Sequence, residues 1–131
     1  MILAGNARGL PSLWADNVND LNAESLLDLY DKNATLMPTF SAHTAGDRAA
    51  VKSYFDQLFS RDSLSVTLHG DTVDAFHLAD QLELVFGVYS FAFEVDRTLL
   101  TFPARFTFVL DFGRSAPILH HHSSQIPRML S

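Results

Sequence analysis

The chain contains no cysteine. It therefore has no disulfide, no thiolate nucleophile and no cysteine-based zinc site. Its 131 residues carry 15 acidic and only 9 basic side chains, which gives a formal net charge of -6. Because neutralising phosphates requires clustered cations, and the sequence has no Lys/Arg stripe, we expect no binding to nucleic acid. An anionic membrane would likewise attract a basic face that this sequence lacks.

Long apolar runs are missing as well. No segment approaches the roughly 20 apolar residues of a membrane span. Near the start, Gly5, Asn6 and Arg8 stand where a signal peptide needs an apolar core. We therefore expect a cytoplasmic protein, although a chain whose leader had been removed would look the same. Hydrophobic residues still make up 47% of the sequence, which is enough for the core of one domain spanning residues 1–131.

Apolar residues at helical spacing are typical of the first part of the chain. They predict one helix over 10–21 and a second from Ala23 to Tyr30, with Asn22 as its N-cap and residues 31–33 as its end. Residues 34–37 predict a short strand. A third helix is predicted by the clearest apolar stripe in the sequence: Val51, Tyr54, Phe55, Leu58 and Phe59.

After residue 62 the pattern changes to four strands with short connections, which predicts antiparallel pairing in sequence order. The expected strands are 64–78, with a kink at 69–71, then 82–94, 99–112 and 118–123. Helices segregated from an antiparallel sheet make an α+β domain. We expect the curved sheet to wrap around the three helices as a cone, whose open mouth is a common place for a small-molecule pocket.

Alternation along the strand over 99–111 separates two faces. One face carries Phe102, Phe106 and Phe108, and the other carries Arg105 between apolar and small residues. The preceding strand is also apolar on both faces, yet the helices can cover only one of them. A second copy of the chain is the simplest cover for the other. We assign Phe102, Phe106 and Phe108 to a homodimer interface and Arg105 to the interior; the reverse assignment is the alternative.

The interior assignment makes Arg105 a candidate ligand-binding residue. A buried guanidinium is costly unless it is paired. Arg105 then needs either an anionic ligand or an internal carboxylate, for which Asp28, Asp31 and Glu83 are the candidates.

The run His120–His122 is the second polar feature. Because consecutive strand residues alternate, only His120 and His122 could share an ion, and no third ligand is apparent, so we expect no metal site. We place His120 and His122 at a subunit contact. His121 lies, by parity, in the pocket with Arg105 and Ser123, and the alternative is that all three imidazoles are satisfied by hydrogen bonds within the sheet.

Taken together, five segments resemble the nuclear-transport-factor-2-like superfamily. Within it, the chain is most similar to the association domain of calcium/calmodulin-dependent protein kinase II and its free-standing bacterial, SnoaL-like relatives. The segments are 23–38 (AESLLDLYDKNATLMP), 46–55 (GDRAAVKSYF), 87–91 (GVYSF), 104–109 (ARFTFV) and 120–127 (HHHSSQIP).

The resemblance implies a cone-shaped, cystatin-like fold that self-associates through its sheet and holds a pocket in each protomer. In the kinase domain that pocket contains arginines. Arg105 falls on the position of one of them, whereas Ser123 stands where the kinase motif has another. The resemblance implies no cofactor, and the chain has no room for a kinase domain.

We therefore expect a non-catalytic oligomerisation domain whose pocket binds a small carboxylate-bearing molecule. The expected ligand-binding residues are Arg105, His121, Ser123, Tyr89, Trp14 and Tyr30. The alternative is a small-molecule enzyme of isomerase, cyclase or hydratase type, similar to ketosteroid isomerase, with His121 or an unidentified acid as its proton-transfer group. No catalytic residue is assigned. A carboxylate beside an enclosed void would favour the enzyme, and a pocket closed by an Arg105–carboxylate bond would favour the binding domain.

Overall fold

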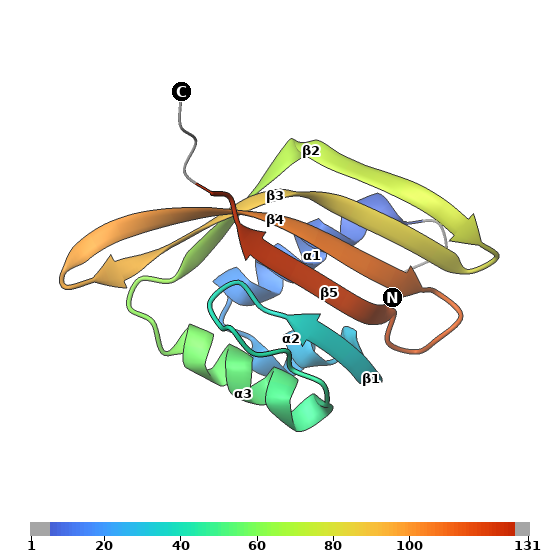
Figure 1. Ribbon diagram of the computed structural model, residues 1–131, viewed down its shortest axis with the longest axis horizontal. Coiled ribbons are helices and arrows are strands. Elements are labelled where there is room, and N and C mark those ends of the chain that lie inside the picture. Colours follow the sequence, from blue (N-terminus) through green and yellow to red (C-terminus); the bar gives the residue numbers. More distant parts are fainter. Residues whose placement is uncertain (1–5, 128–131) are drawn as a thin grey trace.

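The computed structural model describes residues 6–127, and its helices lie against one face of a curved sheet (Figure 1). This is the predicted α+β arrangement. The elements are η1 (Ala7–Gly9), α1 (Leu10–Asn19), α2 (Ala23–Leu27), β1 (Tyr30–Met37), α3 (Arg48–Phe59), β2 (Ser65–Ala79), β3 (Leu82–Val95), β4 (Thr98–Asp111) and β5 (Ile118–Gln125). No helix within this part of the chain is long and apolar enough to cross a membrane.

The sheet has the order β1-β5-β4-β3-β2. Strands β2 to β5 pair antiparallel in sequence order, as their short connections predict. The register of β2 shifts between His69 and Asp74, at the predicted kink. Strand β1 runs parallel to β5 at one edge, which brings segments from opposite ends of the chain side by side (Figure 1).

Side-chain caps begin the second and third helices. The Asn22 carboxamide oxygen accepts the N–H of Ser25 at 3.1 Å, and the Asp47 carboxylate accepts the N–H of Ala50 at 2.8 Å. The predicted end of the second helix was wrong. Helix α2 stops at Leu27 and the chain is already strand at Tyr30, because the backbone there pairs with β5 at Ile118.

The interior of the cone is aromatic, and it contains the residues that we had assigned to the dimer interface. Phe106 and Phe108 are only 2% and 0% exposed within a single chain, and Phe102 stacks on Phe93. Arg105 is exposed on the opposite face. Our assignment of the two faces was therefore wrong: the phenylalanines line the interior, and Arg105 lies on the outer face. The helices pack on the face with the larger rings, since that face buries more apolar surface.

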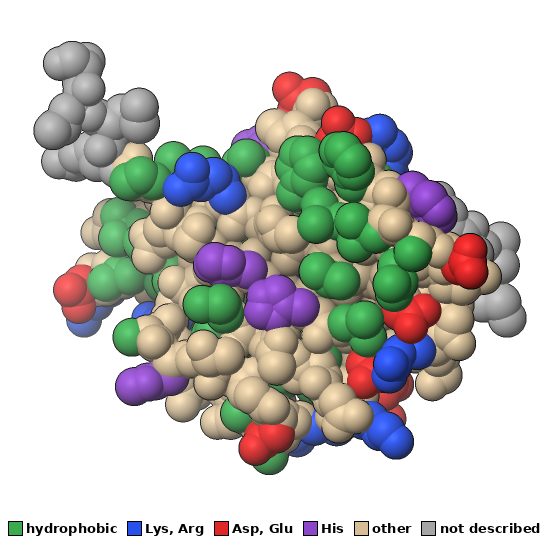
Figure 2. Space-filling model, turned by 45° about the vertical axis from the view of Figure 1, so that its right-hand side comes forward, with side chains coloured by type: hydrophobic (Ala, Val, Ile, Leu, Met, Phe, Trp, Pro, Cys, Tyr) green, Lys and Arg blue, Asp and Glu red, His purple; other side chains and the backbone are tan. Residues whose placement is uncertain are grey.

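The opposite, outer face of the sheet is uncovered by helices and is also apolar, as the alternation predicted. Leu84, Val88 and Val109 are half-buried on it, and Phe76 and Phe86 are 66% and 37% exposed. Figure 2 shows hydrophobic side chains gathered on one side of the molecule with histidines beside them. A sheet face of this kind ordinarily meets a partner.

Candidate functional site

A histidine held between two tyrosines lies in the centre of the cone. His121, on β5, is 1% exposed. The Tyr30 hydroxyl, at the start of β1, lies 2.8 Å from its Nδ1, and the Tyr89 hydroxyl, on β3, lies 3.1 Å from its Nε2. Trp14 of α1 donates its indole N–H to the Tyr30 oxygen at 3.0 Å. Four elements distant in sequence thus supply one connected set of polar groups.

The hydrogen bonds indicate which ring nitrogen of His121 carries the proton. The Tyr30 oxygen already accepts the indole N–H of Trp14, so its own proton is free to be donated to Nδ1 of His121. Nε2 then carries the imidazole proton and donates it to the Tyr89 oxygen. This Nε2–H tautomer gives an acceptor to the indole N–H of Trp14, the hydroxyl proton of Tyr30 and the imidazole N–H of His121.

Burial keeps the three titratable groups of this array uncharged. It lowers the pKa of His121 well below its usual value, and the neighbouring His120 and His122 lower it further. Burial also raises the pKa of the Tyr30 hydroxyl well above its usual value. The pKa of Tyr89 is raised for the same reason, although the nearby Ser123 and Thr39 hydroxyls oppose the rise. The array therefore offers neutral hydrogen-bond donors and acceptors near neutral pH.

A small cavity adjoins this array. Its volume is only about 10 Å³, roughly the space that one water molecule needs and far below the roughly 300–1,000 Å³ of ordinary ligand pockets. Its polar lining comes from Thr39, Tyr54, Tyr89, His121 and Ser123. Of the described residues, His121 and Ser123 are the only polar or charged ones that are fully buried. The cavity as it stands is therefore nearly filled by its own side chains, and its lining is polar but uncharged.

A second, wider hollow lies outside the cavity. Thr39 and Ser123 line both spaces, and their hydroxyls are hydrogen-bonded to each other. The outer hollow has a volume of about 240 Å³ and is formed by residues 37–39, 41–44 and 122–125. The Thr39–Ser123 pair therefore stands between the interior and the surface.

The structure brings five of the six predicted ligand-binding residues together. These are Trp14, Tyr30, Tyr89, His121 and Ser123. Arg105 is not among them, because it points to the outer face. Within residues 6–127 it makes no hydrogen bond or ion pair. The described residues therefore show neither the Arg105–carboxylate bond that would favour a binding domain nor the carboxylate beside an enclosed void that would favour an enzyme. The described residues that line the interior include no cation for an acidic ligand and no carboxylate base.

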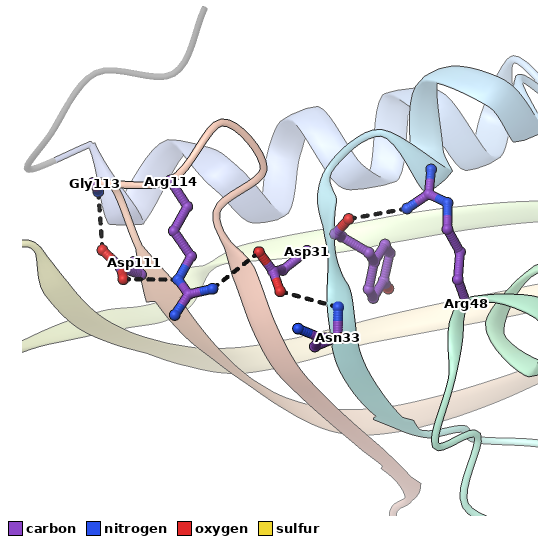
Figure 3. Close-up of polar contacts among 7 residues, drawn as sticks. Asp31, Asn33, Arg48, Asp111, Gly113 and Arg114 are labelled. Atoms are coloured by element: carbon purple, nitrogen blue, oxygen red, sulfur yellow. Dashed lines mark hydrogen bonds and ion pairs between the residues drawn. The ribbon is translucent and has the colours of Figure 1, made fainter.

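The predicted carboxylate partners of Arg105 are bound elsewhere. Asp31 accepts from Arg114 at 3.3 Å, and Arg114 also bonds to Asp111 at 3.1 Å, which ties the β1 edge to the turn after β4 (Figure 3). The N–H of Asn33 and then Arg114 hold the pKa of Asp31 below its usual value. This network is structural.

The site is further fixed by Arg48 at the start of α3. Its guanidinium donates to the Tyr30 carbonyl oxygen at 3.2 Å (Figure 3), and it lies 3.7 Å from a carboxylate oxygen of Asp28. Arg48 thereby holds the strand that presents the Tyr30 hydroxyl to His121. The other predicted partner, Glu83, lies 3.4 Å from the imidazole of His77.

The predicted interface residues divide between the two faces. Phe102, Phe106 and Phe108 are in the interior, while His120 and His122 lie on the outer face beside Val109 and Thr107 of β4. Sequence reasoning missed Thr39 and Tyr54. Tyr54 was read only as part of an apolar stripe, and Thr39 lies in a loop where no periodicity indicates its direction.

No protein-family model matches the chain, and no curated protein matches it either. Solved structures do match. One, from Xanthomonas campestris, is assigned as a calcium/calmodulin-dependent protein kinase II association domain; it is 24% identical with a TM-score of 0.82, over 95% of this chain and 88% of that chain. Another, from Streptomyces avermitilis, is assigned as a dehydratase of the NTF2-like family, with 14% identity, a TM-score of 0.78 and coverage of 95% and 98%.

A third similar structure is an NTF2-like protein with a cystatin-like fold from Novosphingobium aromaticivorans. It is 14% identical with a TM-score of 0.74, over 93% of this chain and 80% of that chain. Likeness at such identities shows the fold. The chain has the NTF2-like, cystatin-like fold that the resemblance predicted, and this fold carries both association domains and enzymes.

Proposed function

We propose that the chain is a self-associating domain that pairs with a second copy through the outer face of its sheet. One observation carries this proposal: an apolar patch covers a sheet face on which no helix of the described chain packs. We call it the outer patch, and it comprises Phe76, Leu84, Phe86, Val88 and Val109. Phe76, Leu84 and Val109 are paired across β2, β3 and β4, and Phe86 and Val88 follow Leu84 at alternate positions on the same face of β3, so the five residues form one continuous surface.

A second copy fits this surface on three grounds. A two-fold axis brings the same patch against itself, so one sequence feature serves both partners. The chain has a net charge of -6, which opposes association wherever carboxylates face each other. The carboxylate in the strand-paired rows that contain the outer patch is Asp74. Its charge is balanced by the ion pair with Arg8, so it does not oppose the approach of a second copy. A structure of the same fold is also assigned as an association domain.

The substitution Phe86→Asp tests the proposal. Phe86 is 37% exposed in the single chain, so the protomer should still fold, as circular dichroism can verify. In sedimentation velocity, the wild type should have at least twice the 14.6 kDa of one chain, and the variant should have the mass of one chain. Leu21→Asp is the control, because Leu21 is 54% exposed in the turn after α1 and its φ of 54° is tolerated by Asp. A single-chain mass for the wild type would overturn the proposal.

The interior supports a second candidate function, small-molecule binding with acid–base chemistry. The observation that favours it is the Tyr30–His121–Tyr89 array beside the cavity. Two hydroxyls and an imidazole form hydrogen bonds with a carbonyl oxygen, and neutral groups of this kind stabilise a developing oxyanion. A structure of the same fold is assigned as a dehydratase. With no cation in its lining, the cavity should take an uncharged ligand in place of the carboxylate that the sequence predicted.

Nuclear magnetic resonance of the His121 ring nitrogens tests this second function. Acetone, a small ketone, should enter only as the cavity widens and should then shift the ring signals saturably, because its carbonyl oxygen accepts the Tyr89 O–H proton and so alters the oxygen to which Nε2–H is donated. Acetate should leave the signals unchanged, because burying its charge without a cation is unfavourable. Ser123→Val should weaken the ketone's effect. Saturation by acetate, or no response to the ketone, would contradict this assignment.

A further inference from the structure

Two histidines extend the outer patch toward the β1 edge of the sheet. Val109 of β4 is paired with His120, and Thr107 with His122, so both imidazoles follow directly after the apolar rows. The Thr35 hydroxyl on β1 bonds to His120 Nδ1 at 2.6 Å, and Met37 is paired with His122. A second copy that covers the outer patch would therefore meet both imidazoles.

Among the residues that the structure describes, the acidic groups around these imidazoles are already paired and do not balance added positive charge. On β4, Arg105 lies two residues from Thr107 and makes no ion pair within residues 6–127. Asp111, further along the same strand, is bonded to Arg114.

On β1 and β2 the nearby acidic groups are likewise already paired, and the other nearby charged or titratable groups are basic. On β1, Asp31 is also bonded to Arg114, and Lys32 adds a positive charge. On β2, at the far end of the His122 row, Asp74 is bonded to Arg8. In the loop before α3, His43 lines the same hollow as His122. Protonating His120 and His122 would thus place two further charges in a strip that already contains Arg105.

We propose that the outer face is a pH-dependent interface, on which neutral His120 and His122 permit two copies to associate and their protonation in mild acid drives the copies apart. This inference rests on the proposed self-association and specifies its regulation. The two proposals depend on different groups: the apolar patch provides the attraction between the copies, and the two imidazoles make that attraction depend on pH.

The direction follows from proton linkage. Burial already lowers the pKa of His120 in the single chain, and His122 adds to the effect. Covering by a second copy removes more water and brings a second set of like charges, both of which lower the pKa of His120 further. The separated chains then bind more protons than the dimer. The dimer is therefore stable at neutral pH and is lost as the pH falls through the pKa of His120 in the separated chain, which lies below the ordinary histidine value of about 6.5.

The test compares dissociation constants at pH 7.5 and pH 5.5 by sedimentation velocity. Each titrating imidazole that must be neutral contributes up to a factor of about ten per pH unit, so the wild type should dissociate at least tenfold more readily at pH 5.5, and reversibly. The double variant His120→Gln, His122→Gln should associate at pH 7.5 and keep its affinity at pH 5.5. His43→Gln, an exposed loop histidine, is the control and should behave as the wild type.

The outcomes separate this inference from the proposal beneath it. A wild type that is monomeric at pH 7.5 would remove the self-association, and the inference with it. A wild type that associates equally at both pH values would overturn the inference alone. The double variant also separates interface protonation from acid unfolding: if it weakens in acid as much as the wild type, another group is responsible and the inference is wrong.

Discussion

Three adjacent histidines have three different environments, and strand geometry accounts for this. His121 faces the interior with Phe108, while His120 and His122 face outward. Sequence parity predicted this separation. It could not predict that His121 and Arg105 would lie on opposite faces, because that depends on the register between β4 and β5. The register shifts at Val109 and Leu110, where one extra residue enters β5, and such a bulge has no signature in this sequence.

Arg105 shows a second limit of sequence reasoning at the level of one residue. Alternation states which side chains share a face, but it does not state which face the helices cover. A lone cation on an apolar strand is compatible with a buried ion pair and with an exposed surface. What decided the matter was the packing of Trp14, which stacks on Tyr89 with ring centroids 5.1 Å apart and so places the aromatic face inside.

The burial of His121 makes the stability of the protein sensitive to acid. Its pKa is lower in the folded chain than in the unfolded chain, so the unfolded chain binds more protons as the pH falls through about 6.5. The free energy of unfolding should therefore decrease below this pH, by at most about 1.4 kcal/mol per unit for this residue. Urea denaturation at pH 7.5, 6.5 and 5.5 measures the effect.

A variant isolates the contribution of His121 from those of the other groups. His121→Gln should be less stable at pH 7.5, because two buried tyrosine hydroxyls lose partners at a cost of about 1–3 kcal/mol. Its stability should nevertheless fall less steeply in acid than that of the wild type. His43→Gln, an exposed substitution, should follow the wild-type curve. Parallel curves for the wild type and His121→Gln would show that this imidazole does not become charged on unfolding.

Among the elements, β1 differs most from its sequence pattern. Residues 23–30 have helical spacing, yet α2 ends at Leu27 and β1 begins at Tyr30. The pattern reflects local preference, whereas the strand is fixed by pairing with β5, about ninety positions later in the chain. The long strands were easier to predict because each is paired with its neighbour in sequence through a short turn.

The loop between β1 and α3 links the fold to the candidate site. Phe40 packs edge-on against Phe91, Phe93 and Phe102, with ring centroids 5.2 to 5.5 Å apart, and its N–H is donated to the Tyr54 hydroxyl at 3.3 Å. Thr39, one residue earlier, bonds to Ser123. The loop is thus anchored by contacts from β3, β4, β5 and α3. Its sequence is polar with a single aromatic residue, and nothing in it indicates that the loop closes the cone.

For the molecule as a whole, the sequence predicted the fold because two independent patterns agreed: helical stripes first, then long alternating strands. It also predicted that the sheet would be apolar on both faces, and this conclusion is unaffected by the exchange of the inner and outer assignments. The helices of the same chain cover the interior face of the sheet. The outer patch stays exposed in the single chain, and the proposed second copy would cover it.

Association through the outer patch should make thermal stability depend on protein concentration. A dimer that must separate before its chains unfold gains stability by mass action, and each tenfold increase in concentration adds up to about 1.4 kcal/mol. Melting curves recorded across a hundredfold range of concentration at pH 7.5 should therefore shift upward by several degrees. Phe86→Asp should remove the shift, whereas Leu21→Asp should preserve it. The wild type at pH 5.5 should resemble Phe86→Asp in this respect, since His120 and His122 then carry charge. If the wild-type melting temperature is independent of concentration at pH 7.5, the outer patch does not contribute to stability through a second copy.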